Sequence, residues 1–217
     1  MAIEPVGEAG PYAARLEIDY APGHGRLSTL LRVFYIIPIF IVYAVLTGGF
    51  GSAAADGAEN AGDGGGGVLA GLIVATALML VFRRRYPRWW FDFARELTRF
   101  GLRVSAYAAL LTDEYPSTVE EQRVRLELDY PDAERDLNRW LPLVKWLLAI
   151  PHFIVLIVLA IGAVLATVVA WFAILITGRY PRGLFDYVVG VFRWGMRVQA
   201  YAFLMLTDRY PPFRLGP

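Results

Sequence analysis

The chain has 217 residues, of which 57% are hydrophobic, and its 21 basic and 20 acidic residues give a net charge of +1. The near-neutral charge excludes a strongly basic nucleic-acid-binding protein, and the hydrophobic fraction exceeds the roughly 45–50% of soluble domains. With no cysteine and only two histidines, we expect no disulfide, no metal site and no other cofactor.

The first half contains two apolar runs, from about residue 27 to 50 and from 68 to 82. Between them, residues 48–67 form a glycine-rich stretch with acidic residues and no basic ones. A membrane-spanning helix needs about 20 apolar residues. We therefore predict a transmembrane helical hairpin joined by a flexible, acidic loop.

The longest apolar run, Trp146 to Thr177, contains no charged residue. It is too long for one upright spanning helix and slightly short for two full spans with a turn. Gly162 near its middle and Pro151 near its start favour a tight helical hairpin. Such a hairpin either crosses a thinned bilayer as two short spans or enters and leaves on one side. One long tilted helix is the remaining interpretation.

Basic residues flank both predicted hairpins on the side away from the acidic loop. They are Arg26, Arg32, Arg83, Arg84, Arg85, Arg88, Arg135, Arg139, Lys145, Arg179 and Arg182. The positive-inside rule then places both termini in the cytoplasm. We expect a multi-pass protein of the bacterial cytoplasmic (inner) membrane.

Several short motifs occur twice, in the same order along the chain. The pairs are Arg15–Tyr20 with Arg125–Tyr130, Arg85–Arg88 with Arg179–Arg182, Phe91–Phe93 with Phe185–Tyr187, Arg103–Tyr107 with Arg197–Tyr201, and Leu111–Pro116 with Leu206–Pro211. We interpret the chain as a tandem duplication, with repeat 1 at residues 1–117 and repeat 2 at 118–217. Two spans per repeat give both repeats the same orientation, whereas three would invert them.

Each repeat is predicted to begin with a strand and to end with an amphipathic helix. The Arg-Leu-Glu motifs alternate apolar and charged residues, as a half-buried strand does. Residues 88–111 place apolar residues at helical spacing, which is typical of a helix lying in the membrane interface. The equivalent residues 184–206 are more apolar, and the alternatives for them are a deeper position in the membrane or packing on the hairpins. The predicted fold class is a mainly α integral membrane protein. It is a tandem duplication of a transmembrane helical hairpin (residues 146–177 in repeat 2) plus an amphipathic interfacial helix, with short cytoplasmic β-strands.

Arginine dominates the basic residues, since Lys145 is the only lysine. A guanidinium binds phosphate in a forked geometry that lysine cannot match. We therefore expect contacts with anionic lipid headgroups, with internal ion pairs as the competing use of this charge. The residues expected at the lipid interface are Arg85, Arg88, Trp89, Trp90, Arg179, Arg182 and Trp194.

Three residues are candidates for an intramembrane polar site: His152, Asp186 and Arg197. His152 is either a proton relay or ligand, or a neutral histidine bonded to a carbonyl that the preceding proline frees. Asp186 with its counterpart Asp92, and Arg197 with its counterpart Arg103, either form an ionic site or serve the structure. In the structural interpretation the aspartates cap helices and the arginines extend to the interface.

The repeated Leu-Thr-Asp-x-Tyr-Pro motif places Asp113 and Asp208 in turns that end helices. Pairing of these aspartates with Arg15 or Arg125 is an alternative. No motif for a catalytic nucleophile, a phosphate-binding loop or a zinc hydrolase is present. We therefore expect no enzymatic activity and no catalytic residues.

The second half resembles a known group of membrane proteins through Trp140–Trp146, Ile150–Phe153, Thr177–Asp186 and Leu206–Phe213. These motifs are similar to those of the bacterial family named for domain of unknown function 4389 (DUF4389), which is common in actinobacteria. The first half matches more loosely, because it has Pro38-Ile39 where the second has Pro151-His152. The resemblance implies a membrane location and assigns no chemistry.

The leading hypothesis is a non-enzymatic scaffold or accessory subunit of the inner membrane. It would form a homo-oligomer or bind a membrane-protein partner, contact anionic lipids, and bind no nucleic acid. The alternative is a small channel, transporter or lipid-translocating protein with a path between the repeats or through an oligomer. A third is an enzyme subunit whose active site lies on another chain.

Overall fold

The computed structural model of the chain describes residues 12–47, 67–118 and 120–216. Its elements follow the order β1 (Ala14–Ile18), α1 (Arg26–Thr47), α3 (Gly67–Arg83), α4 (Arg88–Ala108), β2 (Val124–Leu128), α5 (Lys145–Leu148), α6 (Ile150–Thr177) and α7 (Arg182–Ala202). A 3₁₀ turn, Leu141–Leu143, precedes α5. The predicted mainly helical fold with a small sheet is confirmed. The predicted loop 48–67 lies outside the described residues except for Gly67, which begins α3.

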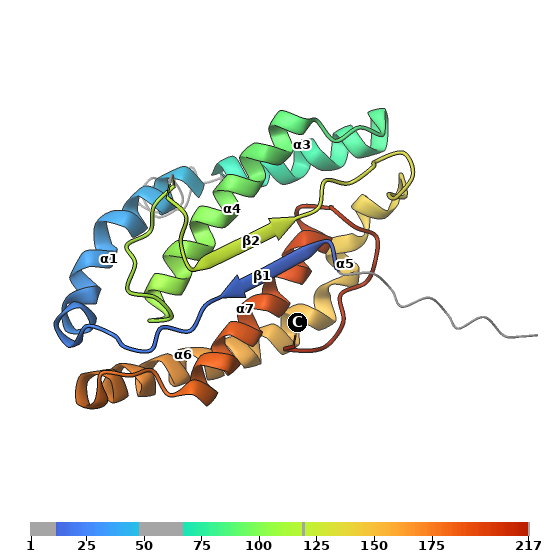
Figure 1. Ribbon diagram of the computed structural model, residues 1–217. Coiled ribbons are helices and arrows are strands. Elements are labelled where there is room, and N and C mark those ends of the chain that lie inside the picture. The colour runs from blue at the N-terminus through green and yellow to red at the C-terminus, as the bar shows by residue number, and fades with distance from the viewer. Residues whose placement is uncertain (1–11, 48–66, 119, 217) are drawn as a thin grey trace, which may run out of the picture.

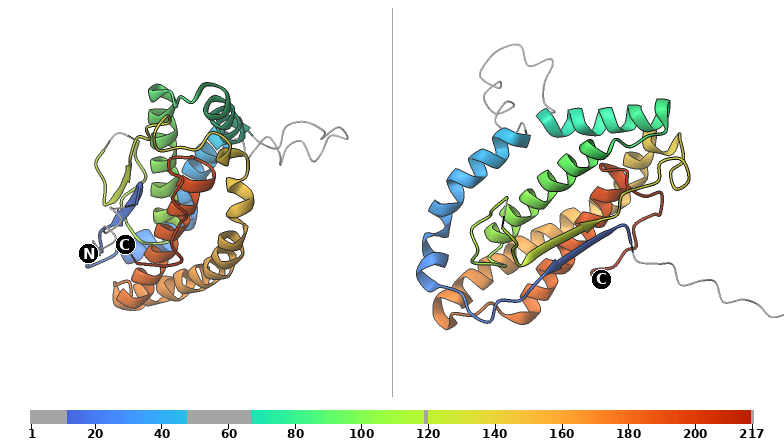
Figure 2. Two further views of the ribbon diagram at one scale, coloured as in Figure 1. Left: turned by 90° about the vertical axis from the view of Figure 1, so that its right-hand side faces the viewer. Right: turned by 45° about the horizontal axis from the view of Figure 1, so that its top comes forward.

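The elements are stacked in three layers, as Figures 1 and 2 show. The two strands form one face, and α4 and α7 lie behind them. The helices α1, α3 and α6 form the outer layer on the far side. The contacts follow this order, because α4 packs against β2 and α1, while α7 packs against β1 and α6.

The strands β1 and β2 pair antiparallel, as the repeated Arg-Leu-Glu motifs predict. Leu16 lies opposite Leu126, Arg15 opposite Glu127, and Glu17 opposite Arg125. Leu16 therefore faces its counterpart in the other motif copy, and the arginine of each copy faces the glutamate of the other. The apolar residues of both strands are buried, except for the half-buried Leu128, and the charged ones are exposed or half-buried. The sheet therefore has one face in the core.

The amphipathic helices α4 and α7 bury their apolar stripes inside the protein. On α4, Phe91, Leu97, Phe100 and Val104 are buried, and α7 is buried along most of its length. The prediction that the stripe of α4 lies in lipid was therefore wrong, and for α7 the alternative of packing inside the protein holds. Periodicity shows that a helix has an apolar face, and here the sheet and the outer helices cover that face.

The apolar run from Trp146 to Thr177 is not a helical hairpin, so this prediction was wrong as well. α6 is continuous over 28 residues. Gly162 serves packing, since a Cβ there would lie 2.5 Å from the Tyr187 hydroxyl on α7. Pro151 lies in the first turn of α6, where its missing N–H breaks no helical bond. Both apparent breaker residues thus fit one long helix.

Two helices are long and apolar enough to cross a membrane, by length and composition: α1 with 22 residues and α6 with 28. The apolar part of α3 is shorter, Ile73–Arg83. α1 contains Pro38. These helices support an association with a membrane, although the core helix of a soluble protein passes the same test. What separates the two cases is the burial of the helix.

Candidate functional site

The outer layer presents large apolar side chains to the surface. On α1 these include Leu27, Phe34, Ile37, Phe40 and Val45, and on α6 Ile154, Ile157, Ile161, Val164, Phe172 and Ile176. Only 11% of the apolar segment is buried in each of these helices. A core helix of a soluble protein would be mostly buried. We therefore call the exposed side of α1, α3 and α6 the apolar face and treat it as a candidate contact surface.

Four arginines that were predicted at the lipid interface lie on the surface. Arg85 and Arg88 are exposed at the turn before α4, and Arg179 and Arg182 are exposed at the turn before α7. These turns lie at opposite ends of the molecule, because α4 and α7 start from opposite ends (Figure 1). The exposed arginines therefore form two groups.

The three tryptophans predicted at the interface have different surroundings. Trp89 is 67% exposed. Trp90 is half-buried and donates its indole N–H to the Thr76 hydroxyl on α3 at 2.8 Å. Trp194 is buried in the core and donates its indole N–H to His152 Nδ1 at 3.0 Å. The expectation for Trp194 was wrong because α7 lies between two layers.

A cluster around Tyr20 joins the end of β1 to the start of α7. The Tyr20 hydroxyl donates to the Tyr180 carbonyl at 2.7 Å. The Arg182 guanidinium lies 4.7 Å from the Tyr20 ring centre, which is cation–π distance. The Tyr20 ring also meets Phe185 edge-on at 5.0 Å. Arg182 therefore has a partner inside the protein as well as access to solvent.

The second strand makes the same contacts with the other turn. The Tyr130 hydroxyl donates to the Tyr86 carbonyl, Arg88 lies 4.9 Å from the Tyr130 ring, and Phe91 meets that ring edge-on at 5.2 Å. Each strand thus holds the Tyr-Pro turn of the other motif copy. The two halves of the chain are interlocked.

Arg32 is a buried cation near the start of α1. Its guanidinium forms an ion pair with Asp113. The same group donates to the carbonyls of Tyr107 and Thr112 at 3.0 and 2.8 Å and lies 4.4 Å from the Tyr107 ring. Arg32 therefore ties α1 to the end of α4 and to the Leu-Thr-Asp motif that follows.

Asp113 is held by more than this arginine. It accepts the Gly25 N–H at 2.7 Å, and His24 Nδ1 lies 3.2 Å from its other oxygen. Burial alone would raise the pKa of Asp113, but the hydrogen bonds from His24 and Gly25 and the charge of Arg32 lower that pKa to about 2. The carboxylate is therefore charged at neutral pH.

Lys145 repeats the arrangement at the other end of the fold. It is fully buried on α5, and its ammonium lies 2.7 Å from Asp208 and donates to the Thr207 carbonyl at 2.8 Å. The Tyr201 ring lies 5.3 Å away. Burial lowers the pKa of Lys145, and the bond to Asp208 opposes that effect. The Asn138 N–H completes the site by donating to Asp208 at 2.5 Å.

The predicted partners of these aspartates are engaged elsewhere. Arg15 pairs with Glu127 and Asp129 across the sheet, and Arg125 pairs with Asp19. The alternative in which Asp113 or Asp208 pairs with these arginines was therefore wrong. A signal for the real pairing was present, since Arg32 and Lys145 each stand six residues before a proline, Pro38 and Pro151.

His152 is fully buried near the start of α6. Its Nδ1 accepts the indole N–H of Trp194, so the ring is in the neutral form that carries its proton on Nε2. Phe213 stacks on the imidazole at a centroid distance of 3.9 Å, and Tyr210 lies at 4.7 Å. The expected bond to a backbone carbonyl is replaced by this aromatic enclosure.

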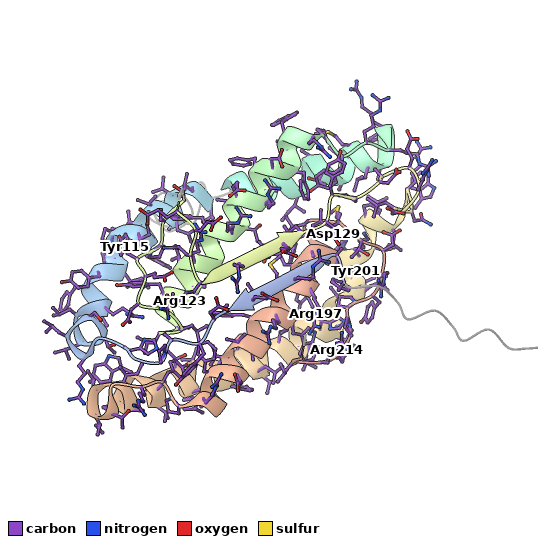
Figure 3. All side chains as sticks on the ribbon, viewed as in Figure 1. Tyr115, Arg123, Asp129, Arg197, Tyr201 and Arg214 are labelled. Atoms are coloured by element: carbon purple, nitrogen blue, oxygen red, sulfur yellow. The ribbon has the colours of Figure 1, made fainter. Side chains whose placement is uncertain are left out.

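Arg197 is buried and donates to the carbonyls of Arg214 and Gly216 (Figure 3). Arg103 likewise donates to the carbonyl of Ser117. Neither arginine extends to the interface as the structural interpretation expected. Burial lowers the pKa of both guanidinium groups. Each fixes the segment that follows its own Tyr-Pro motif.

The three predicted polar residues do not form one site. Asp186 is exposed on α7, while His152 lies in its aromatic enclosure and Arg197 binds the C-terminal segment. Among the described residues, no hydrogen bond or ion pair joins any two of the three. Asp92 is paired with Arg95 at 3.3 Å. The described residues also contain no group of three or more side chains arranged to hold a metal ion.

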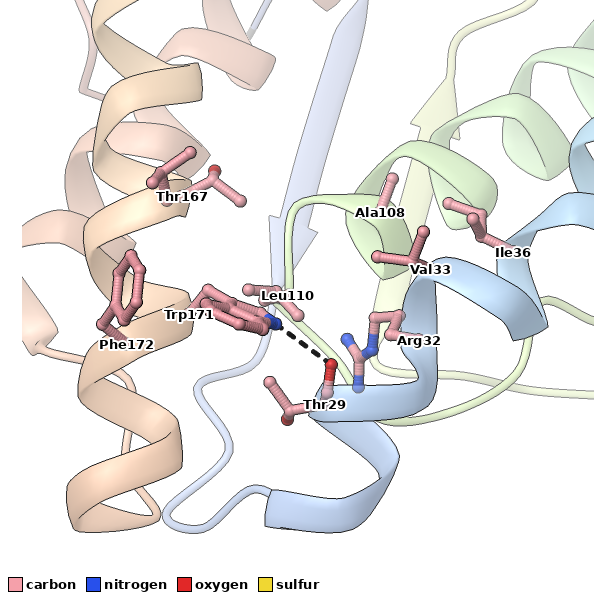
Figure 4. A pocket seen from close by; sticks show the side chains of 10 residues that line it. Thr29, Arg32, Val33, Ile36, Ala108, Leu110, Thr167, Trp171 and Phe172 are labelled. Atoms are coloured by element: carbon pink, nitrogen blue, oxygen red, sulfur yellow. Dashed lines mark hydrogen bonds between the residues drawn. The ribbon is translucent and has the colours of Figure 1, made fainter.

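A cavity of about 400 Å³ opens between α1, α6 and the end of α4 (Figure 4). Its walls are mostly apolar and include Val33, Ile36, Ala108, Leu110, Val168 and Phe172. Trp171 closes one side by donating its indole N–H to the Thr29 carbonyl at 3.2 Å. Arg32 is the charged residue among those that line the cavity.

The C-terminal part of the chain matches a known family. The model of the family described as "Domain of unknown function (DUF4389)" matches residues 140–214. This segment is therefore similar to the DUF4389 domain. It contains α5, α6, α7 and the tail that carries Asp208 and Phe213, so it includes the Lys145 site and the His152 enclosure. The resemblance predicted from the sequence is thereby confirmed over this segment.

The description of the DUF4389 family assigns no activity. No curated protein and no solved structure matches the chain.

Proposed function

We propose that the protein is a non-enzymatic, membrane-associated scaffold or accessory subunit. The observation that carries this proposal is the apolar face of α1, α3 and α6, of which α1 and α6 are only 11% buried in their apolar segments. Apolar surface that stays in contact with water costs about 25 cal/mol per Å² relative to the same surface buried. This face therefore requires lipid or another protein as its cover.

Lipid fits the apolar face better than a protein partner alone. The exposed residues run along the whole of two helices of 22 and 28 residues, so the apolar face is much longer than a local docking patch. The cavity beside Trp171 has apolar walls of the kind that receive an acyl chain. We propose the inner membrane of a bacterium as the location.

The exposed arginines support contacts with anionic headgroups. Arg85, Arg88, Arg179 and Arg182 lie at the two ends of the molecule, next to apolar helix termini. Each contributes on the order of 1 kcal/mol near an anionic surface. We propose that these arginines and Trp89 contact headgroups, and that the protein forms homo-oligomers or binds a membrane-protein partner.

The competing proposal is a channel or a lipid-translocating protein. It would require a polar path, and the sequence offered His152, Asp186 and Arg197 for it. These residues make separate contacts, and two of them hold backbone or aromatic groups inside the fold. This arrangement favours the scaffold.

The first test is to isolate membranes and cytosol from bacterial cells that express the protein, and then to release the protein for native mass spectrometry. We expect it in the membrane fraction after washing with high salt, with bound anionic lipid and either a second copy or another protein. Recovery from the cytosol as a lipid-free monomer would overturn the proposal. A membrane-bound monomer without a protein partner would overturn the scaffold role and support only the proposed lipid contact.

A further inference from the structure

Cationic residues lie beyond both ends of α6. Arg135 and Arg139 precede it, and Arg179 and Arg182 follow it. Because α6 is one continuous helix of 28 residues, these two groups are separated by about 42 Å of helix. A helix that crossed the bilayer would put one group on the side where basic residues are disfavoured.

The helix α7 runs antiparallel beside α6 over much of its length. His152 near the start of α6 bonds Trp194 at 3.0 Å, and farther along α6 the Leu159 carbonyl accepts the Tyr187 hydroxyl at 3.0 Å. If α6 were inserted across a bilayer, α7 would therefore be inserted to the same depth.

The chain segment that contains β1 runs alongside α7. The Arg193 guanidinium of α7 donates to the Leu16 carbonyl at 3.0 Å, and the Tyr20 hydroxyl reaches the Tyr180 carbonyl just before α7 begins. α6, α7 and this segment thus lie side by side, with the segment on the side away from the apolar face (Figure 2).

That segment carries exposed charges along its length. Arg15 pairs with Asp129 and with Glu127, whose side chains are 50% and 71% exposed. Asp19 pairs with Arg125 at 2.9 Å. If α6 crossed the membrane, these charges would lie at the depth of the hydrocarbon core, where charged groups are strongly disfavoured. The molecule is apolar on one side and charged on the other, rather than apolar in its middle.

We propose that α6 lies along the membrane surface, with its outer side in a single leaflet, and does not cross the bilayer. This inference rests on the membrane association proposed above and specifies its geometry. The occupant of the α6 surface is one lipid leaflet. The arginines at both ends of the helix then contact headgroups on the same side, which removes the conflict with the charge distribution.

The test uses single cysteines, since the chain has none of its own. Ile154, Ile161 and Val168 lie on one side of α6 and are 61%, 60% and 49% exposed. Each is replaced by cysteine, labelled with a fluorophore and reconstituted in phosphatidylethanolamine–phosphatidylglycerol vesicles. Lipids with a nitroxide near the headgroup or deep in the acyl chain then serve as quenchers. Glu17→Cys on the sheet is the control and should be quenched by neither lipid.

A surface orientation predicts the same ratio of shallow to deep quenching, within about twofold, at all three positions. The positions span about 21 Å along the axis, so a crossing helix would give ratios that differ several-fold and would overturn the inference. Absence of quenching at all three positions in membrane-bound protein would also overturn it, by showing that another protein covers α6. Failure to bind vesicles would instead contradict the proposed function.

A second measurement reads the two ends of the helix directly. Asp136→Cys and Gly183→Cys flank α6, and a Cβ at Gly183 meets no atom within 4 Å. In spheroplasts, a membrane-impermeant maleimide should label both or neither before the cells are lysed. Labelling of only one of them would show that α6 crosses the membrane.

Discussion

The Arg32 and Lys145 sites both pair a buried cation with an aspartate, but the cation is an arginine in one and a lysine in the other. In each, a buried cation forms an ion pair with the aspartate of a Leu-Thr-Asp motif, Arg32 with Asp113 and Lys145 with Asp208. The same aspartate also accepts a backbone N–H, from Gly25 in the first site and from Asn138 in the second. Each cation stands six residues before a proline and seven residues after the residue that gives this N–H. Arg32 also holds two carbonyls, whereas Lys145 holds one. The lysine site therefore depends more on its carboxylate than the arginine site does.

The largest expected effect comes from removing the carboxylates. Asp208→Ala leaves Lys145 buried and unpaired, and should lower the free energy of unfolding by about 3–5 kcal/mol. Asp113→Ala should cost less, about 1.5–3 kcal/mol, because Arg32 keeps its two carbonyl acceptors. Thermal unfolding in detergent, with Asp136→Ala as the exposed control, ranks the variants. Equal losses at both sites would contradict the proposed difference.

Exchanging the cation sharpens the same comparison. Arg32→Lys keeps the charge but cannot reach Asp113 and both carbonyls at once. We expect a loss of about 1.5–3 kcal/mol, measured by thermal unfolding beside the exposed control Arg83→Lys. A stability equal to that of the unmodified protein would show that the carbonyl bonds contribute nothing.

The paired glycines of α4 and α7 give a third contrast. A Cβ at Gly101 would lie 2.7 Å from the Tyr43 hydroxyl, whereas at Gly195 it would meet nothing within 4 Å. Gly101→Ala should lower stability by about 1–3 kcal/mol through overpacking. Gly195→Ala should raise it by up to about 1 kcal/mol through helix propensity. We therefore expect the melting temperature to fall for Gly101→Ala and to rise for Gly195→Ala. Equal shifts in the two variants would contradict the packing difference.

The smallest effect is the pH dependence of the Asp113 site. Its pKa is lowered to about 2 from the ordinary 3.8. The stabilisation from this ionisation is therefore fully present above about pH 4 and is lost as the pH falls toward 2. The stability difference between the unmodified protein and Asp113→Asn should narrow over that interval. A difference that stays constant from pH 6 to 2.5 would show that the carboxylate does not titrate there.

The candidate interface residues were only partly identifiable from the sequence. Arg85, Arg88, Arg179 and Arg182 are exposed, as a position at an interface requires, because charged side chains are seldom fully buried unless they are paired. Trp194 could not be placed in this way, since an aromatic residue satisfies a lipid interface and a protein core equally well. Its burial follows from the position of α7 between two layers.

By itself, the sequence determined the apolar helices, the alternating strands and the repeated motifs, since these depend on the local period of side chains along the chain. Only the tertiary structure decided that Gly162 receives Tyr187 instead of a turn, that α4 and α7 face protein instead of lipid, and that Asp113 and Asp208 meet Arg32 and Lys145. These outcomes depend on which surfaces meet across long sequence separations. A local pattern shows that a face is apolar or a group is charged, and the packing of distant segments selects its partner.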